Sequence, residues 1–233
     1  MVDEGAVIID IGGESTRPGA SGVSEQEELD RVLPVIESVR SVTDVMISVD
    51  TSKPAVMRAA VAAGASMIND VAALQAEGAL AAAAELKVPV CLMHMRGQPR
   101  SMQDAPSYHD VVAEVAAFLD ERIDACTAAG LDEDLIVVDP GFGFGKTHAH
   151  NVELLANLRQ LQVRGRPLLA GISRKSTLGE LTGRDTEDRM PASVAAAVIA
   201  VLNGADIIRA HDVAETTDAI KVARAVMETG EKQ

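Results

Sequence analysis

Short apolar runs recur along the chain, and a polar or charged residue closes each of them. The runs are rich in Val and Ile, a pattern typical of strands that are buried on both faces of a parallel sheet. We therefore expect seven buried strands. They are Ala6–Ile11, Met46–Val49, Ser66–Ile68, Pro89–Met93, Leu135–Val138, Pro167–Ile172 and Ala205–Ile208.

Stretches with a helical spacing of apolar residues lie between these runs. An alternation of strands and helices predicts parallel strands joined by right-handed crossovers, so the expected fold class is α/β. The stretches include Glu27–Val39, Pro54–Ala63, Gly78–Glu85, Tyr108–Ala129, Asn151–Leu161 and Met190–Leu202.

A Gly-Ala pair stands directly before three of the predicted strands, at Gly5, Gly64 and Gly204. Glycine there fits the left-handed residue that ends a preceding helix, so Met1–Glu4 is expected to be the last turn of a helix. A closed barrel of this type has eight strands. We therefore expect one domain over residues 1–233, a TIM (β/α)8-type barrel that lacks its first strand and most of its first helix.

The composition limits which side chains can fill the core, which partners the protein can bind and where in the cell it is expected. Hydrophobic residues make up 47% of the 233 residues and aromatic residues only 2%, so branched aliphatic side chains must fill the core. The net charge of −14 argues against nucleic acid or an anionic membrane surface as a partner. Cys91 and Cys126 are far apart, and Cys91 is interpreted as a small core residue. With no apolar stretch long enough to span a bilayer and no basic signal region, we expect a cytoplasmic protein.

The segment from Leu135 to Lys146, LIVVDPGFGFGK, combines a buried strand with a candidate site. Asp139 closes the strand, and Pro140 and three glycines follow it. Glycines allow a tight turn and a close approach of the backbone to a ligand. A charge at the end of a buried parallel strand is where α/β proteins place their chemistry.

If the strands are parallel, their polar ends meet at one mouth. Carboxylates and amides there suit a ligand with adjacent N–H donors and ring nitrogens. Arg209 and His211 stand two residues apart at a strand end and suit an anion, as does Arg17. The mouth would gather Asp10, Arg17, Asp50, Asn69, Asp70, His94, Asp139, Lys175, Arg209 and His211.

Some of these polar residues also have a purely structural interpretation. Asp10 lies inside its run and can hydrogen-bond across the barrel interior. Asp70 can support neighbouring groups or cap a helix, and His94, between two methionines, can be a hydrogen-bonded core residue. His148 and His150 lack further ligand candidates nearby, so we expect loop residues in solvent rather than a metal site.

Seven motifs, taken in order, resemble dihydropteroate synthases, and the resemblance runs from Gly5 to the C-terminal helix. Several long motifs in the right order make it specific. They are GGESTRPG at 12–19, SVDTSK at 48–53, IND at 68–70, CLMHM at 91–95, DPGFGFGK at 139–146, SRKS at 173–176 and IRAHD at 208–212.

The resemblance implies a homodimeric TIM barrel that joins 6-hydroxymethyl-7,8-dihydropterin diphosphate to 4-aminobenzoate, with Mg²⁺ accompanying the diphosphate. It implies that diphosphate leaves before the aniline nitrogen attacks, and that the enzyme is a sulfonamide target. The catalytic residues would be Asp50, Lys175, Arg209 and His211. The substrate-binding residues would be Thr16, Arg17, Asp50, Asn69, Met93, Asp139, Phe144, Gly171, Lys175, Arg209 and His211.

One departure from the family pattern concerns the first strand, where the family has an Asn that helps to hold magnesium and diphosphate, followed by a Thr-Pro-Asp-Ser-Phe-Ser loop. Neither occurs here, so no metal ligand is expected in this chain, and Met1 would correspond to an internal methionine. An open barrel exposes two strand edges. We therefore expect the chain as written to be unstable or nearly inactive unless that unit is supplied.

Two other functions remain compatible with the sequence. Pterin-binding methyltransferases share the barrel and the Asp/Asn pterin contacts, but have no use for the Arg-x-His pair or the Ser-Arg-Lys-Ser run. A non-catalytic, truncated chain that binds pterin without turnover is the second alternative.

Overall fold

The computed structural model describes residues 1–16, 19–97, 102–103 and 105–230. All seven predicted strands are present and every ladder is parallel. The strands are β1 (Ile8–Gly12), β2 (Met46–Asp50), β3 (Met67–Asp70), β4 (Val90–Met93), β5 (Ile136–Asp139), β6 (Leu169–Ala170) and β7 (Ile207–Ile208).

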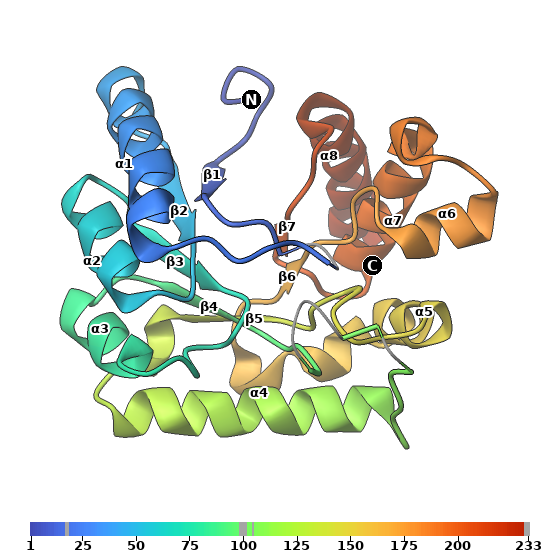
Figure 1. Cartoon of the computed structure of the whole chain (residues 1–233). Coiled ribbons are helices and arrows are strands. Elements are labelled where there is room, and N and C mark those ends of the chain that lie inside the picture. The colour runs from blue at the N-terminus through green and yellow to red at the C-terminus, as the bar shows by residue number, and fades with distance from the viewer. Residues whose placement is uncertain (17–18, 98–101, 104, 231–233) are drawn as a thin grey trace.

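The strands follow chain order around a TIM barrel that is open along one side. β1 to β5 form one continuous sheet, β6 pairs with β7, and a parallel bridge between Val138 and Leu168 joins the two groups. The expected barrel is thus confirmed, with β1 and β7 at its two ends. Figure 1 shows the helices outside the strands, with α1 to α4 following the larger sheet.

The helices agree with most of the predicted stretches. Pro54 and Pro191 occupy the first turns of α2 and α7, where their missing N–H groups are not needed. The helices are α1 (Glu25–Val42), α2 (Pro54–Ala62), α3 (Ala79–Leu86), α4 (Val111–Ala128), α5 (His148–Ala156), α6 (Ser176–Thr182), α7 (Met190–Leu202) and α8 (Val213–Gly230), with 3-10 turns at Glu133–Leu135, Leu158–Leu161, Val163–Gly165 and Thr186–Asp188.

His148 and His150 were predicted to lie in a loop, but both lie in the first turn of α5, where His148 is exposed to solvent as expected. The helix begins at His148 because the Thr147 hydroxyl accepts from the backbone N–H of His150 while the His150 ring accepts from that of Thr147. His148 Nδ1 lies 3.2 Å from Thr177 Oγ1. The predicted helix also ends earlier than expected, and a 3-10 turn continues it to Leu161.

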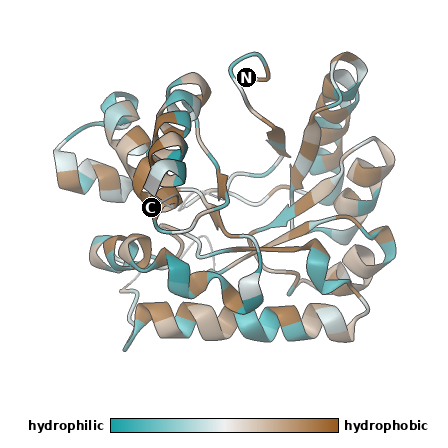
Figure 2. Ribbon diagram, turned by 180° about the vertical axis from the view of Figure 1, so that it is seen from behind, coloured by the Kyte–Doolittle hydropathy of each residue, from teal (hydrophilic) through white to brown (hydrophobic). Residues whose placement is uncertain are grey.

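Two apolar clusters form the core. Met67, Cys91, Val137 and Leu169 point into the barrel as one layer, which confirms Cys91 as a core residue. A larger cluster fills the space between strands and helices, and Figure 2 shows apolar residues recurring along the strands and on the helix sides that face them. The barrel interior is therefore filled by side chains below the mouth.

The three Gly-Ala pairs end their segments with the same two hydrogen bonds. The alanine N–H bonds to the carbonyl five residues earlier, and the glycine N–H bonds to the carbonyl three residues earlier. Gly5, Gly64 and Gly204 have φ of +104°, +116° and +101°. This is the Schellman ending predicted from the sequence, and it includes the turn at Met1–Gly5.

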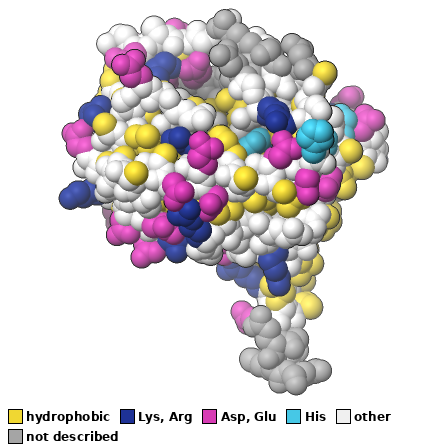
Figure 3. All heavy atoms as spheres, turned by 90° about the horizontal axis from the view of Figure 1, so that it is seen from below, with side chains coloured by type: hydrophobic (Ala, Val, Ile, Leu, Met, Phe, Trp, Pro, Cys, Tyr) yellow, Lys and Arg dark blue, Asp and Glu magenta, His cyan; other side chains and the backbone are white. Residues whose placement is uncertain are grey.

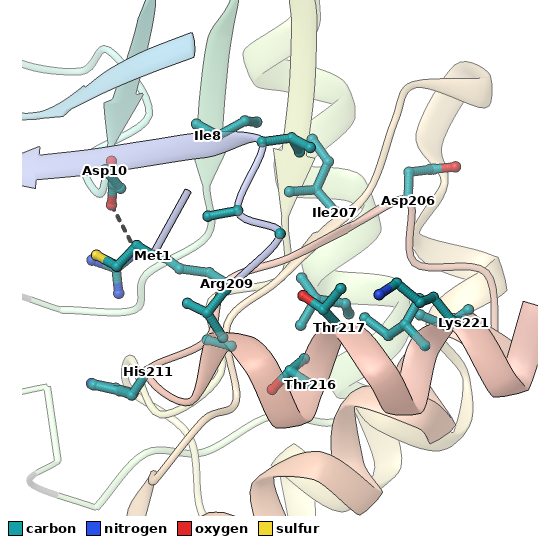
Figure 4. Close-up of a pocket in the computed structure, with 18 of the residues that line it drawn as sticks. Met1, Ile8, Asp10, Asp206, Ile207, Arg209, His211, Thr216, Thr217 and Lys221 are labelled. Atoms are coloured by element: carbon teal, nitrogen blue, oxygen red, sulfur yellow. Dashed lines mark hydrogen bonds and ion pairs between the residues drawn. The ribbon is translucent and has the colours of Figure 1, made fainter. Parts of the chain in front are cut away.

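A groove of about 590 Å³ runs along the open side, between β1 and α8. Figure 4 shows Ile8, Ile207, Thr217 and Lys221 around it. Since β1 and β7 are edge strands of the described structure, each has backbone groups without a ladder partner along the groove. We call this groove, with its two edge strands, the seam.

The outer surface carries charges of both signs. Figure 3 shows acidic and basic side chains intermixed with scattered apolar ones on the face seen from below in Figure 1. Arg164, for example, pairs with Asp120 and Asp124 of α4. In the described part of the chain, no helix is both long and apolar enough to cross a bilayer.

Candidate active site

The polar residues at the ends of the strands lie at the same level of the barrel. Asp50 ends β2 and is aligned with Gly12 of β1 on one side and with Asn69 of β3 on the other. Asp139 ends β5 and is aligned with Met93. Parallel strands therefore bring these side chains to one mouth, although they are up to 89 residues apart in the chain.

Arg209, just after β7, connects the carboxylates of this mouth. Its Nε lies 2.7 Å from Asp10 Oδ2, and its Nη2 lies 3.8 Å from Asp50 Oδ2. Asn69 Nδ2 donates to the same Asp10 oxygen at 3.3 Å, so Asp10 bonds across the barrel interior as expected. Figure 4 shows the Asp10–Arg209 contact reaching across the seam. The guanidinium is half exposed and open to a further anion.

Asp139, at the end of β5, and Lys175, in the loop after β6, form another part of the mouth. The Lys175 ammonium donates to the carbonyl of Phe142 and lies 4.8 Å from the centre of the Phe144 ring. Asp139 Oδ1 accepts from the backbone N–H of Gly141 at 2.7 Å. The glycine-rich segment after β5 thus orients both the carboxylate and the lysine.

Burial shifts the protonation of these groups. Loss of solvent, followed by the neighbouring Asp10 charge, raises the pKa of Asp50 to about 7, although Arg209 opposes the shift. Burial also raises the pKa of Asp139, against the effect of Lys175, and lowers the pKa of Lys175 to about 8. A cationic ligand near Asp50 would favour its ionised form.

The loops after β6 and β7 are tied to each other. Ser173 Oγ lies 3.0 Å from His211 Nδ1 and accepts from the His211 backbone N–H. Arg174 forms a two-pronged ion pair with Asp212, at 2.5 and 3.1 Å. These contacts place His211 beside Arg209 and next to the start of α6.

The remaining predicted substrate-binding residues take different places. Met93 is buried at the end of β4, and Phe144 and Thr16 are half-buried. A side chain on Gly171 would meet Arg209, since its first carbon would lie 3.8 Å from the Arg209 Cβ. Arg17 lies outside the described residues.

Two structural interpretations of polar residues are also resolved. Asp70 accepts from the Ser52 hydroxyl and from the backbone N–H groups of Ala72 and Leu74, so it supports the turn after β3 rather than capping a helix. His94 is a buried, hydrogen-bonded histidine, as expected, and its partner is Lys146.

Lys146, Ser173 and Arg174 are functional candidates to which the sequence had assigned no individual role. Lys146 ends the glycine-rich motif, and a lysine after a run of glycines was a signal that could have been followed. For Ser173 and Arg174, the partners are 38 residues away, so no local pattern could reveal the contacts.

The described residues contain no group of three or more His, Cys, Asp or Glu side chains placed to hold a metal ion. At the mouth, the two carboxylates of Asp10 and Asp50 share the single guanidinium of Arg209.

Comparison with known proteins identifies the family. Residues 1–211 match the model of the pterin binding enzyme family. The chain is 51% identical over 233 residues to the dihydropteroate synthase of Escherichia coli (strain K12), covering all of this chain and 83% of that protein. The chain belongs to the dihydropteroate synthase family.

Solved structures of dihydropteroate synthases have the same fold. The Yersinia pestis enzyme in complex with a sulfonamide drug superposes with a TM-score of 0.96 at 52% identity, covering 97% of this chain and 82% of that one. The Xanthomonas albilineans enzyme in complex with 7,8-dihydropteroate gives 0.89 at 53% identity, covering 97% and 81%. These relatives favour the synthase over the methyltransferase alternative.

Dihydropteroate synthases are transferases. They condense 6-hydroxymethyl-7,8-dihydropterin diphosphate with 4-aminobenzoate to give 7,8-dihydropteroate and diphosphate. That reaction needs a binding site for a flat heterocycle and a binding site for the departing anion. The strand ends of this barrel offer side chains suited to both.

Proposed function

We propose that the mouth divides the dihydropteroate synthase reaction between two sets of residues. The pterin half holds the ring through carboxylates, an amide and an ammonium, which match its adjacent donors and ring nitrogens. The anion half holds the diphosphate. The pterin half is Asp50, Asn69, Asp139 and Lys175 with Met93, Phe144 and Gly171 around them, and the anion half is Arg17, Arg209 and His211.

The observation that carries this proposal is the position of Arg209 between the carboxylates of the mouth. Arg209 contacts Asp10 and Asp50. Its charge also acts to lower the pKa values of Asp139 and Lys175, and the charge of Asp139 acts to raise the pKa of Arg209. The two halves therefore adjoin at one guanidinium, as a substrate carrying its leaving group on a pterin requires.

In the proposed reaction, the bond between the pterin methylene carbon and the diphosphate oxygen breaks, and the electron pair leaves with the diphosphate. Arg209 and His211 stabilise the negative charge that develops on the leaving group. Asp50 offsets the positive charge left on the pterin, which shifts Asp50 toward its ionised form. The aniline nitrogen of 4-aminobenzoate then bonds to the methylene carbon and releases a proton.

We place 4-aminobenzoate under the segment Gly12–Ser24, which includes Thr16 and Arg17. Lys53 anchors the start of this segment by pairing with both Glu14 and the buried Glu28. Closure of the segment over the second substrate would exclude water from the pterin cation.

Diphosphate release that depends on 4-aminobenzoate tests the assignment. With both substrates, we expect diphosphate and 7,8-dihydropteroate in equal amounts. Asp139→Asn should weaken pterin binding with little effect on diphosphate binding. Pterin binding without any product would instead support the non-catalytic alternative, whereas release of diphosphate without 4-aminobenzoate would show hydrolysis of the pterin substrate and contradict the synthase assignment.

Magnesium, in this proposal, enters with the diphosphate rather than as a resident ion. Mg²⁺ commonly keeps several water ligands and binds substrate phosphates through one or two protein groups. Titration of the protein with Mg²⁺ in the absence of diphosphate should therefore give no binding isotherm.

We further propose a homodimer formed through α7 and α8. Ile199 and Leu202 on α7, and Val222 and Val226 on α8, are exposed apolar residues on two helices that pack side by side. Val226→Glu should shift the sedimentation coefficient toward that of the monomer. The free, buried thiols of Cys91 and Cys126 fit the reducing cytoplasm, which is the proposed location.

A further inference from the structure

Lys146, the last residue of the glycine-rich motif, is buried beneath the loop that it ends, with only 2% of its surface exposed. Its ammonium contacts the carbonyl oxygens of Gly141 at 2.9 Å and Phe144 at 3.1 Å, both in its own loop. It also contacts His94 in the loop after β4, at 2.8 Å to Nδ1 and 3.3 Å to the carbonyl oxygen. One side chain thus joins two loops at the mouth.

The two loops lie backbone against backbone at this point. Gly141 and Gly145 have φ of +68° and +65°, and a side chain on either would overlap a carbonyl oxygen, that of His94 or that of Arg96. A turn with such angles forms no ladder, so its buried carbonyls need other partners. The ammonium of Lys146 donates to the carbonyls of Gly141 and Phe144, and the Gly141 carbonyl also accepts from the backbone N–H of Phe144.

The contact between Lys146 and His94 can persist in either protonation state of the lysine. Burial and the Lys146 charge lower the pKa of His94 to about 3, so the ring is neutral and Nδ1 accepts from the ammonium. Burial lowers the pKa of Lys146 to about 7, with Asp139 opposing the shift. A neutral amine could accept from the other His94 tautomer and still donate to two carbonyls.

The loop held by Lys146 orients residues of the pterin half, while its other hydrogen bonds anchor it to Gln103, Tyr108 and Asn151. Its Gly141 N–H fixes Asp139, its Phe142 carbonyl accepts from Lys175, and its Phe144 ring lies against the Lys175 ammonium. We propose that Lys146, together with His94, is the positioning residue of the pterin half. This inference rests on the proposed assignment of the pterin half.

The test replaces Lys146 by Met, which keeps the length of the side chain but removes its N–H donors. The ligands are 6-hydroxymethylpterin and inorganic diphosphate, each titrated by calorimetry. For Lys146→Met, we expect the dissociation constant of the pterin to rise about 10-fold to 100-fold, as expected when hydrogen bonds from a charged group are lost. That of diphosphate should change less than about twofold. Lys146→Gln, which retains one donor group, should recover part of the pterin affinity.

The matched control is Lys87→Met at an exposed lysine after α3, which should leave both constants unchanged. Equal losses of pterin and diphosphate affinity in Lys146→Met would show a general structural role and overturn the proposal. So would an unchanged pterin affinity.

Amide hydrogen exchange separates this inference from the assignment on which it rests. In Lys146→Met, the amides of residues 141–145 should exchange faster, while those of residues 173–176 should keep their rates. If the parent chain binds no pterin, the pterin half is misassigned, and the exchange rates alone decide whether Lys146 holds the loop. Unchanged exchange at 141–145 would refute that as well.

Discussion

Asp139 and Arg209 stand at the same mouth but on differently supported strands. β5, which carries Asp139, has β4 on one side and is joined to β6 on the other. β7, which precedes Arg209, pairs with β6 on one side and borders the seam on the other. Asp139 thus ends a strand with a neighbour on each side, whereas Arg209 follows a strand at an edge.

The contacts of the two halves differ in the same way. Lys175 is held by the loop after β5, which Lys146 fixes from below. Arg209 instead forms an ion pair with Asp10 across the seam. The other oxygen of that carboxylate, Oδ1, is buried and has no hydrogen-bond partner among the described residues. Within the described residues, the strand end that carries Asp139 is therefore supported on both sides, whereas the one that carries Arg209 is supported on one side.

The largest effect on turnover is expected when a strand and helix are added at the seam, between β1 and β7. Fusing a first βα unit ahead of Met1, taken from a longer relative, should raise turnover by about 10³-fold or more, because it supports the edge that carries the transition-state charge. Turnover of both chains is measured by diphosphate release. A glycine-serine extension of equal length is the control, and comparable rates for all three chains would refute the expectation.

Removing the cation of the anion half should have the next largest effect. In the chain with the seam filled, Arg209→Met should lower kcat about 10²-fold to 10³-fold through loss of charge stabilisation on the leaving diphosphate. Affinity for 6-hydroxymethylpterin should change little. Arg159→Met, at an exposed arginine outside the mouth, serves as the control. A larger loss of pterin affinity than of kcat would contradict the division into halves.

Asp50 gives a prediction about stability. Its pKa is about 7 in the folded chain against 3.8 for an aspartate in water, so between these pH values the folded chain holds a proton that the unfolded chain lacks. Stability should therefore fall as the pH rises through this range. Asp50→Asn should raise Tm at about pH 7.5 by roughly 2–6 °C and leave it nearly unchanged at about pH 4. Equal shifts at both pH values would argue against this origin, and Asp3→Asn is the surface control.

The smallest effect concerns the orientation of His211. Ser173→Ala removes the hydroxyl that lies 3.0 Å from its Nδ1 and should lower kcat about fivefold, the value of one hydrogen bond of about 1 kcal/mol. The KM for the pterin substrate should stay within about twofold. A change in that KM without a change in kcat would place Ser173 in the pterin half instead.

Strand positions could be predicted because each buried strand is a local apolar run, and the left-handed glycines because a helix end is local too. The start of α5 at His148 could not, because a histidine completes a capping box where Glu or Gln is usual. The seven-residue helix α6 is too short to show a clear period.

The candidate site, like the fold, could be predicted from the sequence only in part. The strand-end positions of Asp50, Asn69 and Asp139 follow from parallel pairing, and their meeting at one mouth was predictable. The roles assigned to them stay predictions until they are tested. The contact of Lys146 with His94 joins residues 52 positions apart, so only the packed structure could show it.

The hydrogen-bonded glycine ending at Gly5 has a consequence for protein engineering. Met1–Gly5 already forms the same Schellman turn that connects helix to strand at Gly64 and Gly204. A helix fused in frame ahead of Met1 could therefore run directly into β1 without a designed linker. The turn that an added helix would need before β1 is therefore already present in this chain.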